Sequence, residues 1–289
     1  MLLQFITNGI ITGLLYSLLA IGFALVYNTT HIFHIAAAGI YVFAAYMFWL
    51  FGAKLGMNLL VSVFIALLLT MFLSVLSETA LYRPLRKKNS SLSVIMISSI
   101  GLMTIIVNLI ALFFGNESKV IDRAMLTTFS VGNIIVTTPQ LYQIIVALIA
   151  ISLFLIVLSI SKFGLKIRAI SADETLYETL GYNKQNTYLV AFLLSGLFIG
   201  LASCATVYDV GLDPHMGMTV LINAMVAMII GGIGRFGTCV LGGLLLGILQ
   251  SMTVYFFATN WQNAITFTLL LGFLFLRPQG VAGYKQRTV

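Results

Sequence analysis

Long apolar runs separated by short polar connections dominate the chain. Eight runs cover residues 5–27, 35–51, 57–81, 92–114, 140–161, 187–208, 217–233 and 239–258, and a shorter ninth covers 262–276. About 20 apolar residues in a helix cross the hydrocarbon core of a bilayer, where backbone polar groups must be paired within helices or closed barrels. Barrel strands would alternate apolar and polar residues, and these runs do not. We therefore expect an all-α, polytopic membrane protein of about eight transmembrane helices, forming a single domain over residues 1–289.

The second run differs from the others at its entry. The stretch from Asn28 to Gly39 is polar and rich in small residues, and the run that follows it is short. This pattern is typical of a broken or re-entrant helix near residues 31–51. Two alternatives stay open: if residues 35–51 span the membrane, Met1 lies outside, and if they re-enter, Met1 lies inside.

Composition and charge agree with this class and indicate an orientation. Hydrophobic residues make up 60% of the 289 and charged residues 8%, against roughly 25% charged in a soluble domain. The net charge of +7 reflects basic loops rather than nucleic-acid binding. One alternating topology places 12 of the 15 basic residues on one side, which we expect to be cytoplasmic. These 12 lie in residues 82–90 and 162–186, at Arg235, and in the tail at Arg277, Lys285 and Arg287.

The motifs that suggest catalysis are weak. Residues 232–237 fit G-x-G-x-x-G, but no acidic residue follows Asp213, so we interpret them as a tight turn between membrane helices. Among the acidic residues, Glu78 alone lies within an apolar run, and we expect it to pair with the basic cluster that follows it. His31 and His34 have a spacing compatible with metal ligation but no nearby Cys or carboxylate. We expect no enzyme activity, no metal and no cofactor.

The cytoplasmic connection 162–186 has a helical pattern of its own. Asp173 suits a helix start and Gly181 a helix stop, and Leu176 and Leu180 fall on one face between them. Such a helix is suited to docking into a soluble partner, although a helix lying passively on the bilayer is the alternative. Lys184 follows the stop and is expected to be solvated.

Four blocks of sequence, in this order and spacing, resemble the LIV-type permeases of ATP-binding-cassette (ABC) importers. The first is Glu78-Thr79-Ala80-Leu81-Tyr82-Arg83-Pro84-Leu85-Arg86, and the second is the segment 168–183. The third is the glycine-rich pair of helices from Ala224 to Gly247, and the fourth is Arg277-Pro278-Gln279-Gly280. The resemblance covers nearly the whole chain.

The resemblance implies a permease subunit, in the bacterial inner membrane, for branched-chain or other neutral amino acids. Its partners would be a second, homologous permease, two cytoplasmic ATP-binding subunits that hydrolyse ATP, and an external solute-binding protein, within the lipid bilayer and without nucleic acid. A urea, short-chain amide or nucleoside permease is the alternative within the class. An ion-coupled secondary transporter or channel is the alternative from another class, and a metal-ion permease using His31, His34 and His215 is a further rival.

Two groups of residues follow as candidates. Small uncharged polar residues should line the solute pathway, and we select His34, Asn28, Thr30 and Asn223. The docking segment should couple the permease to the ATPases through Arg168, Glu174, Leu176, Glu178, Leu180 and Gly181, with the two glutamates orienting the partner and the leucines contacting it.

Several positions depart from the family pattern. His34 stands for an asparagine and Ala37 for a histidine, Gln250 stands where an acidic residue is common, and Tyr177 stands where a small one is common. These departures concern solute specificity rather than the fold.

Overall fold

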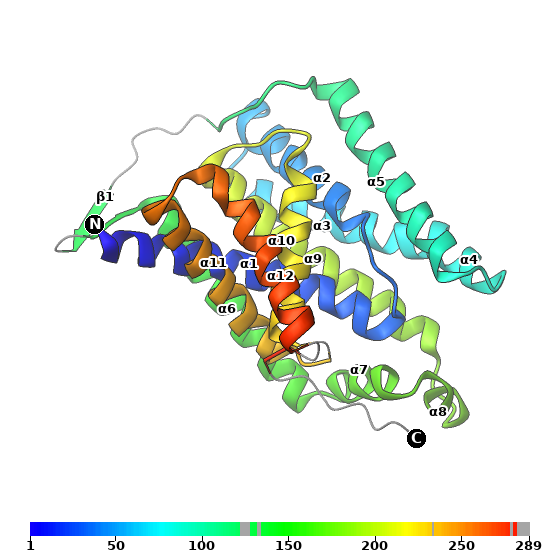
Figure 1. The fold of residues 1–289 in the computed structure, drawn as a ribbon. Coiled ribbons are helices and arrows are strands. Elements are labelled where there is room, and N and C mark those ends of the chain that lie inside the picture. The colour runs from blue at the N-terminus through cyan, green and yellow to red at the C-terminus, as the bar shows by residue number, and fades with distance from the viewer. Residues whose placement is uncertain (122–127, 132–133, 233, 278–279, 282–289) are drawn as a thin grey trace.

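The computed structural model describes residues 1–121, 128–131, 134–232, 234–277 and 280–281. Helices make up nearly all of it (Figure 1). They are α1 (Leu2–Thr30), α2 (Ala37–Trp49), α3 (Leu59–Ser77), α4 (Arg83–Lys87), α5 (Leu92–Phe114), α6 (Thr138–Ile160), α7 (Lys162–Ala172), α8 (Glu174–Thr179), α9 (Lys184–Val210), α10 (Met216–Gly231), α11 (Phe236–Phe256) and α12 (Gln262–Leu276). The expected all-α class is confirmed.

Short irregular elements join these helices. The π-helical turns η1 (Leu50–Lys54) and η2 (Glu78–Tyr82) extend α2 and link α3 to α4, and the 3₁₀ turn η3 (Thr259–Trp261) precedes α12. Strands β1 (Thr128–Val131) and β2 (Ile134–Thr137) pair antiparallel, with Thr128 opposite Thr137.

Seven helical spans are long and apolar enough to cross a membrane: Leu2–Thr30, Ala37–Lys54, Leu59–Lys87, Leu92–Phe114, Thr138–Ile160, Lys184–Val210 and Phe236–Phe256. Helices α10 and α12 correspond to the predicted runs 217–233 and 262–276 and are shorter, with 16 and 15 residues. The chain is therefore a multi-pass membrane protein, as expected.

Where α1 and α2 begin and end bears on the two alternatives for residues 35–51. Gln4, near the start of α1, exchanges hydrogen bonds of 2.9 and 2.8 Å with the backbone of Ile135 in β2. Helix α2 begins beside Tyr82 and ends at Trp49, whose ring lies 4.7 Å from the Lys119 ammonium. Its extension Ala37–Lys54 thus crosses the bundle, and the start of α1 lies at the end that carries β1 (Figure 1).

The basic residues mark the two ends of the bundle. Arg83, Arg86, Lys87 and Lys88 close α3 and α4, while Lys162, Lys166, Arg168 and Lys184 surround α7 and α8 at the same end. Arg235 and Arg277 belong to it too, because Phe154 of α6 contacts Phe236 of α11, and Val281 donates to the Ile230 carbonyl. Lys54 and Lys119 lie at the opposite end. Arg123, Lys285 and Arg287 are outside the described residues.

Helix α1 is the centre of the bundle because it is apolar on all sides. It runs beside α11 (Figure 1), and glycines permit this close approach. A Cβ added at Gly13 would lie 2.8 Å from Leu244 Cα, and one at Gly243 would lie 2.6 Å from Ser17 N. The small residues of these helices therefore serve packing, as such patterns do in membranes.

Candidate functional site

The connection 162–186 forms two helices that meet at Asp173. The extended backbone of Asp173 (φ −157°) ends α7, and its carboxylate accepts hydrogen bonds from Thr175 N (2.9 Å) and Leu176 N (3.0 Å) to begin α8. A hydrogen bond from the Thr175 hydroxyl, followed by that from the Leu176 amide, lowers the pKa of Asp173. Gly181, at φ +81°, follows the end of α8. The predicted helix start at Asp173 and stop at Gly181 are confirmed, and Arg168 belongs to the preceding helix α7.

Helix α8 is attached to its own chain by one buried side chain. Tyr177 is 2% exposed and packs with Ile170 and Tyr188, and its hydroxyl lies 2.9 Å from that of Thr187. The sequence marked Tyr177 only as a departure from the family pattern. A large aromatic residue at this position provides the anchor that holds α8 against α9.

Lys184 is an ion-pair partner of α8, contrary to the expectation that it is solvated. Its ammonium lies 2.9 Å from a carboxylate oxygen of Glu174 and 3.0 Å from one of Glu178. Burial acts to raise the pKa of Glu174, but the hydrogen bonds from Lys184 and Tyr188 and the charge of Lys184 lower it overall. Both carboxylates therefore hold α8 to the start of α9, a role that their sequence positions did not reveal.

The exposed face of α8 carries the two leucines. Leu176 is 56% and Leu180 65% exposed. Helix α8 lies at the basic end of the molecule (Figure 1). Its contacts through Tyr177 and Lys184 hold it from behind, so the two exposed leucines form an apolar ridge on its outer side. We call Leu176 and Leu180 the α8 ridge.

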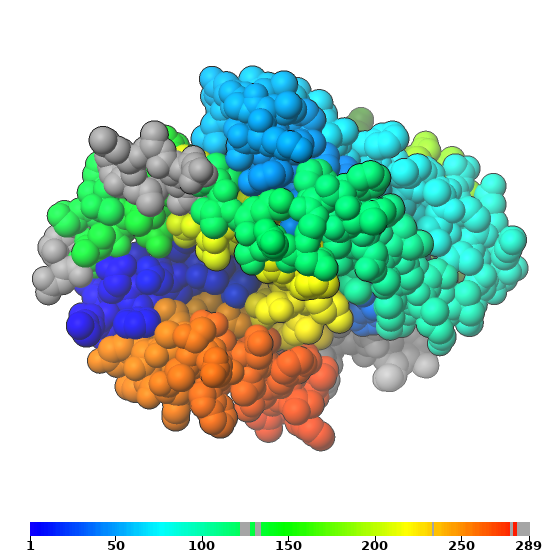
Figure 2. Space-filling model, turned by 90° about the horizontal axis from the view of Figure 1, so that it is seen from above, coloured from blue at the N-terminus to red at the C-terminus, as the bar shows by residue number. Residues whose placement is uncertain are grey.

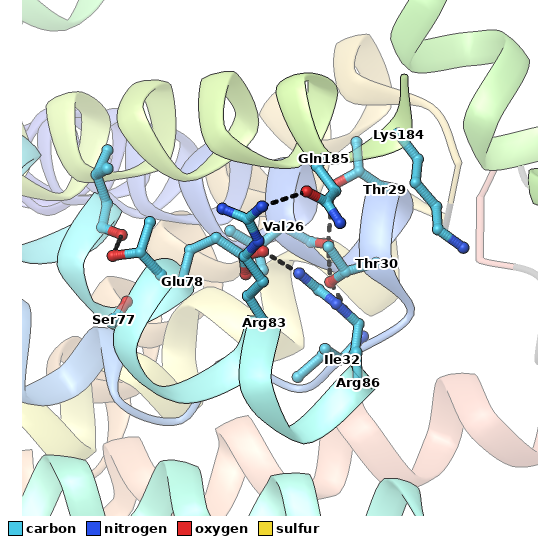
Figure 3. Close-up of polar contacts among 12 residues, drawn as sticks. Val26, Thr29, Thr30, Ile32, Ser77, Glu78, Arg83, Arg86, Lys184 and Gln185 are labelled. Atoms are coloured by element: carbon cyan, nitrogen blue, oxygen red, sulfur yellow. Dashed lines mark hydrogen bonds and ion pairs between the residues drawn. The ribbon is translucent and has the colours of Figure 1, made fainter. Parts of the chain in front are cut away.

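A network of polar contacts connects α9 with the end of α3 (Figure 3). Glu78, 1% exposed, pairs with Arg86, as expected from the sequence, and the Arg86 guanidinium lies 4.4 Å from the Tyr188 ring centroid. Arg83 Nη2 donates to Gln185 Oε1 at 2.6 Å. The 78–86 block therefore contacts the first turns of α9, the same turns that hold α8.

The same block reaches the break between α1 and α2 through Tyr82. His31, at φ 55°, ends α1, and the chain turns before α2 begins. The fully buried Tyr82 hydroxyl lies 2.8 Å from His34 Nδ1 and 2.7 Å from Ser99 Oγ, which also accepts from Ala36 N at 2.9 Å. Tyr82 therefore ties the break to α3 and α5. Tyr82 belongs to the 78–86 block that resembles the family, but its contact with His34 could not be predicted from the sequence.

The four predicted pathway residues lie in two separate places. His34 is in the α1–α2 break, and Thr30 stabilises the break by accepting a hydrogen bond from Ile32 N at 3.3 Å. Asn28, 2% exposed, precedes it on α1, and neither polar atom of its amide has a hydrogen-bond partner among the described residues. Asn223 is on α10 in a different cluster, so the structure does not gather the four residues at one site.

Asn223 belongs to an uncharged polar cluster that joins four helices. Its Nδ2 donates to the Tyr16 hydroxyl on α1 (3.2 Å), which donates in turn to Gln250 Oε1 on α11 (2.9 Å). Gln250 Nε2 donates to Asn223 Oδ1 (3.1 Å) and to Thr266 Oγ1 on α12 (2.5 Å). Gln250 suits this site because, unlike a carboxylate, it both donates and accepts without bringing a charge into the interior.

The seven helical spans and their glycine-mediated packing define a polytopic membrane protein. The family described as "Branched-chain amino acid transport system / permease component" matches residues 5–274. The chain therefore belongs to this family of transport permease components.

Several proteins of known description are similar to this chain over nearly its whole length. It is 27% identical to the high-affinity branched-chain amino acid transport system permease protein BraD of Pseudomonas aeruginosa, over 97% of this chain and 95% of BraD. It is 26% identical to LivH of Escherichia coli K12, a protein of the same description, with the same coverage. A probable branched-chain amino acid transport permease protein, LivH of Methanocaldococcus jannaschii, is 24% identical over 96% of this chain and 91% of that protein.

Among solved structures, the chain resembles PsaBC from Streptococcus pneumoniae in complex with Fab, with a TM-score of 0.51. The two are 15% identical over 96% of this chain and 93% of that one. At this identity the likeness concerns the fold alone.

Proposed function

We propose that this chain is a permease subunit of an ABC importer in the bacterial inner membrane. It pairs with a second, homologous permease, receives solute from an external binding protein, and is driven by two cytoplasmic ATPases that carry all the ATP hydrolysis. The observation that carries the proposal is the α8 ridge: two exposed leucines on a helix fixed to the bundle, at the basic end, in a chain of this permease family.

Energy coupling follows the contacts behind the ridge. A displacement of α8 is transmitted to α9 through Lys184 and Tyr177. From α9 it is transmitted to the 78–86 block through Gln185 and Tyr188. Tyr82 continues the route to His34 and the α1–α2 break. Packed side chains and hydrogen bonds of this kind let a small movement at one end rearrange another element.

The solute we propose is a branched-chain or other neutral amino acid. A zwitterion has no net charge, and neither the polar groups named at the α1–α2 break (Asn28, Thr30 and His34) nor the cluster of Tyr16, Asn223, Gln250 and Thr266 contains a carboxylate, an ammonium or a guanidinium group. A urea, amide or nucleoside permease has the same need for uncharged polar groups and is the alternative solute class.

The deciding experiment measures solute binding by the cognate external protein, followed by ATP-driven uptake into proteoliposomes that contain the whole complex. Leucine, isoleucine and valine should bind and compete with one another, and acetamide, urea and uridine should not. Binding of an amide or nucleoside in preference to amino acids would refute the proposed solute and leave the importer mechanism in place.

An ion-coupled carrier makes the opposite prediction. Such carriers use an ionisable group at membrane depth, whereas Glu78 lies at the end of α3 and is neutralised by Arg86. Uptake by the isolated chain in response to a proton or sodium gradient, without ATPases, would favour the carrier.

A further inference from the structure

Helix α7 exposes one side on which apolar residues lie between cations. Its buried residues, Gly164, Ile167 and Ile170, face its own chain. At about 100° per residue, the opposite side carries all the exposed residues of the helix: Lys162, Leu165, Lys166, Arg168, Ala169 and Ala172. The three apolar residues form the middle of this side, with the two lysines along one edge and Arg168 along the other. We call these six residues the α7 face.

The first turn of α7 lies against the last turns of the membrane span before it. A Cβ added at Gly164 would lie 2.8 Å from the Cα of Leu158, which is two residues before the end of α6. Two helical residues correspond to roughly 3 Å along the axis, whereas the headgroup region is about 5 Å or more thick on each side of the hydrocarbon core. The α7 face therefore begins at the level of the lipid headgroups.

The composition of the α7 face differs from that of a surface inside the hydrocarbon region. Helix α5 is an example of such a surface: it lies on the outside of the molecule, in cyan to green (Figure 2), and none of its residues is charged. Its exposed residues include large apolar ones such as Ile97 and Leu112. The α7 face instead combines one exposed leucine with three cations. Long basic side chains beside apolar ones suit the boundary between hydrocarbon and water.

The charges of α7 are not neutralised within the chain. Lys166 Nζ lies 5.7 Å from the Tyr182 ring centroid, and Arg168 Nε donates to the Gly164 carbonyl at 3.3 Å. Both contacts leave the positive charge in place, and among the described residues no carboxylate pairs with a cation of the α7 face.

Helix α8 has the opposite sign of charge. Its N-cap Asp173 and its own Glu174 and Glu178 are carboxylates, and α8 itself contains no cation. An anionic surface therefore attracts α7 and does not attract α8. The cytoplasmic leaflet of a membrane is such a surface, and it attracts each basic residue that lies close to it.

We propose that the α7 face binds anionic phospholipid in the leaflet at the basic end of the molecule. Leu165 enters the acyl region, while the two lysines and Arg168 contact the headgroup phosphates. The bilayer thus holds the start of the connection 162–186, and the α8 ridge stays outside the lipid. The inference goes beyond the proposed function and does not require it. The ATPase is the competing occupant of the α7 face.

A fluorescence test compares two leucines of similar exposure on adjacent helices. Leu165 is 61% and Leu176 56% exposed. Each is replaced by cysteine in the full chain, labelled with bimane, and reconstituted in nanodiscs of phosphatidylglycerol and phosphatidylcholine. The native cysteines, Cys204 and Cys239, are buried and do not compete for the label. One lipid at a time carries a spin label just below its headgroup, and quenching is expressed relative to Leu153→Cys on the exposed side of α6.

With spin-labelled phosphatidylglycerol, quenching should be roughly three-fold stronger at position 165 than at position 176, because the attraction to the membrane surface falls off within a Debye length. Equal quenching at the two positions, or none at position 165, would overturn the proposal.

A charge test separates attraction from mere proximity. Lys162→Gln with Lys166→Gln, in the Leu165→Cys chain, should reduce quenching by spin-labelled phosphatidylglycerol roughly two-fold and leave quenching by spin-labelled phosphatidylcholine unchanged. The matched control, Lys87→Gln with Lys88→Gln, removes two exposed cations from the same end of the molecule and should change neither. No reduction in the lysine variant, or the same reduction in the control, contradicts the assignment of the α7 face.

The competing occupant is tested in the whole transporter. Quenching at position 165 by spin-labelled phosphatidylglycerol should persist when the ATPases are bound. Its loss on ATPase binding would assign the α7 face to the ATPase instead of lipid. The measurements on the single chain need no partner, so they test this inference even if the proposed importer function is wrong.

Discussion

Replacing Leu180 by aspartate tests whether the α8 ridge is the docking surface for an ATPase. Leu180 is 65% exposed and directly follows α8, and the two glutamates of this helix are already paired with Lys184. The new carboxylate would therefore stay in water in the free subunit. Substitutions at such exposed positions change the free energy of unfolding by about 0.5 kcal/mol or less.

The same substitution should weaken binding of a partner that covers the ridge. Leaving an unpaired charge at a dry contact costs about 3 kcal/mol or more. Since about 1.4 kcal/mol corresponds to a factor of ten in an equilibrium constant, ATPase binding should weaken roughly 100-fold. Membrane insertion should be unaffected because α8 lies at the basic end of the molecule, beyond the spans.

The measurement is recovery of the ATPases with the tagged, detergent-solubilised permease, together with solute uptake. Leu55→Asp is the matched control, since Leu55 is 55% exposed and follows Lys54 at the opposite end of the bundle. It should keep the ATPases bound. If Leu180→Asp retains both ATPase recovery and uptake, α8 is a passive surface helix and the coupling route described above is wrong.

Four further changes test the structure and the coupling route. Tyr82→Phe leaves the partners of a buried hydroxyl unsatisfied, at about 1–3 kcal/mol, so uptake per assembled complex should fall while ATPase recovery persists. Lys184→Glu would face Glu174 and Glu178 with a third carboxylate, so ATPase recovery should fall, and an unchanged recovery would show that α8 does not depend on this contact. Gly243→Ala would place a Cβ 2.6 Å from Ser17 N and should reduce accumulation in the membrane, whereas Gly237→Ala meets nothing within 4 Å and should accumulate normally. Lys87→Cys should resist an impermeant thiol reagent applied outside intact cells, and efficient labelling would reverse the orientation.

The sequence alone was sufficient to predict the structural class and the approximate ends of most helices. Continuous apolar runs have one stable solution in lipid, because each backbone polar group must be paired within its own helix. Helix α8 was equally predictable, since Asp173 and Gly181 act locally on the backbone next to them. The pairing of Glu78 with the basic cluster was also accessible, because Arg86 is two helical turns further along the same segment.

The tertiary structure decided what lies opposite each side chain. Lys184 looks solvated in the sequence because it follows a helix stop, yet the chain reverses at Gly181 and brings it back to Glu174 and Glu178. Tyr82 and His34 are 48 positions apart, and no local pattern indicates that they touch. Likewise, Asn223 appeared to be one of four pathway residues, although helix packing places it with Tyr16 and Gln250 instead.

Helix α5 shows most clearly which features follow from the sequence and which depend on the tertiary structure. Its composition marks it as a membrane helix, and its periodicity places Gly101, Thr104 and Asn108 on one side. Whether that side faces the interior or the outside depends on how α5 packs against α2, a contact between segments separated by a whole helix. Periodicity defines the faces of a helix, because it is a property of neighbouring residues. Only the packing of distant segments decides which face is buried.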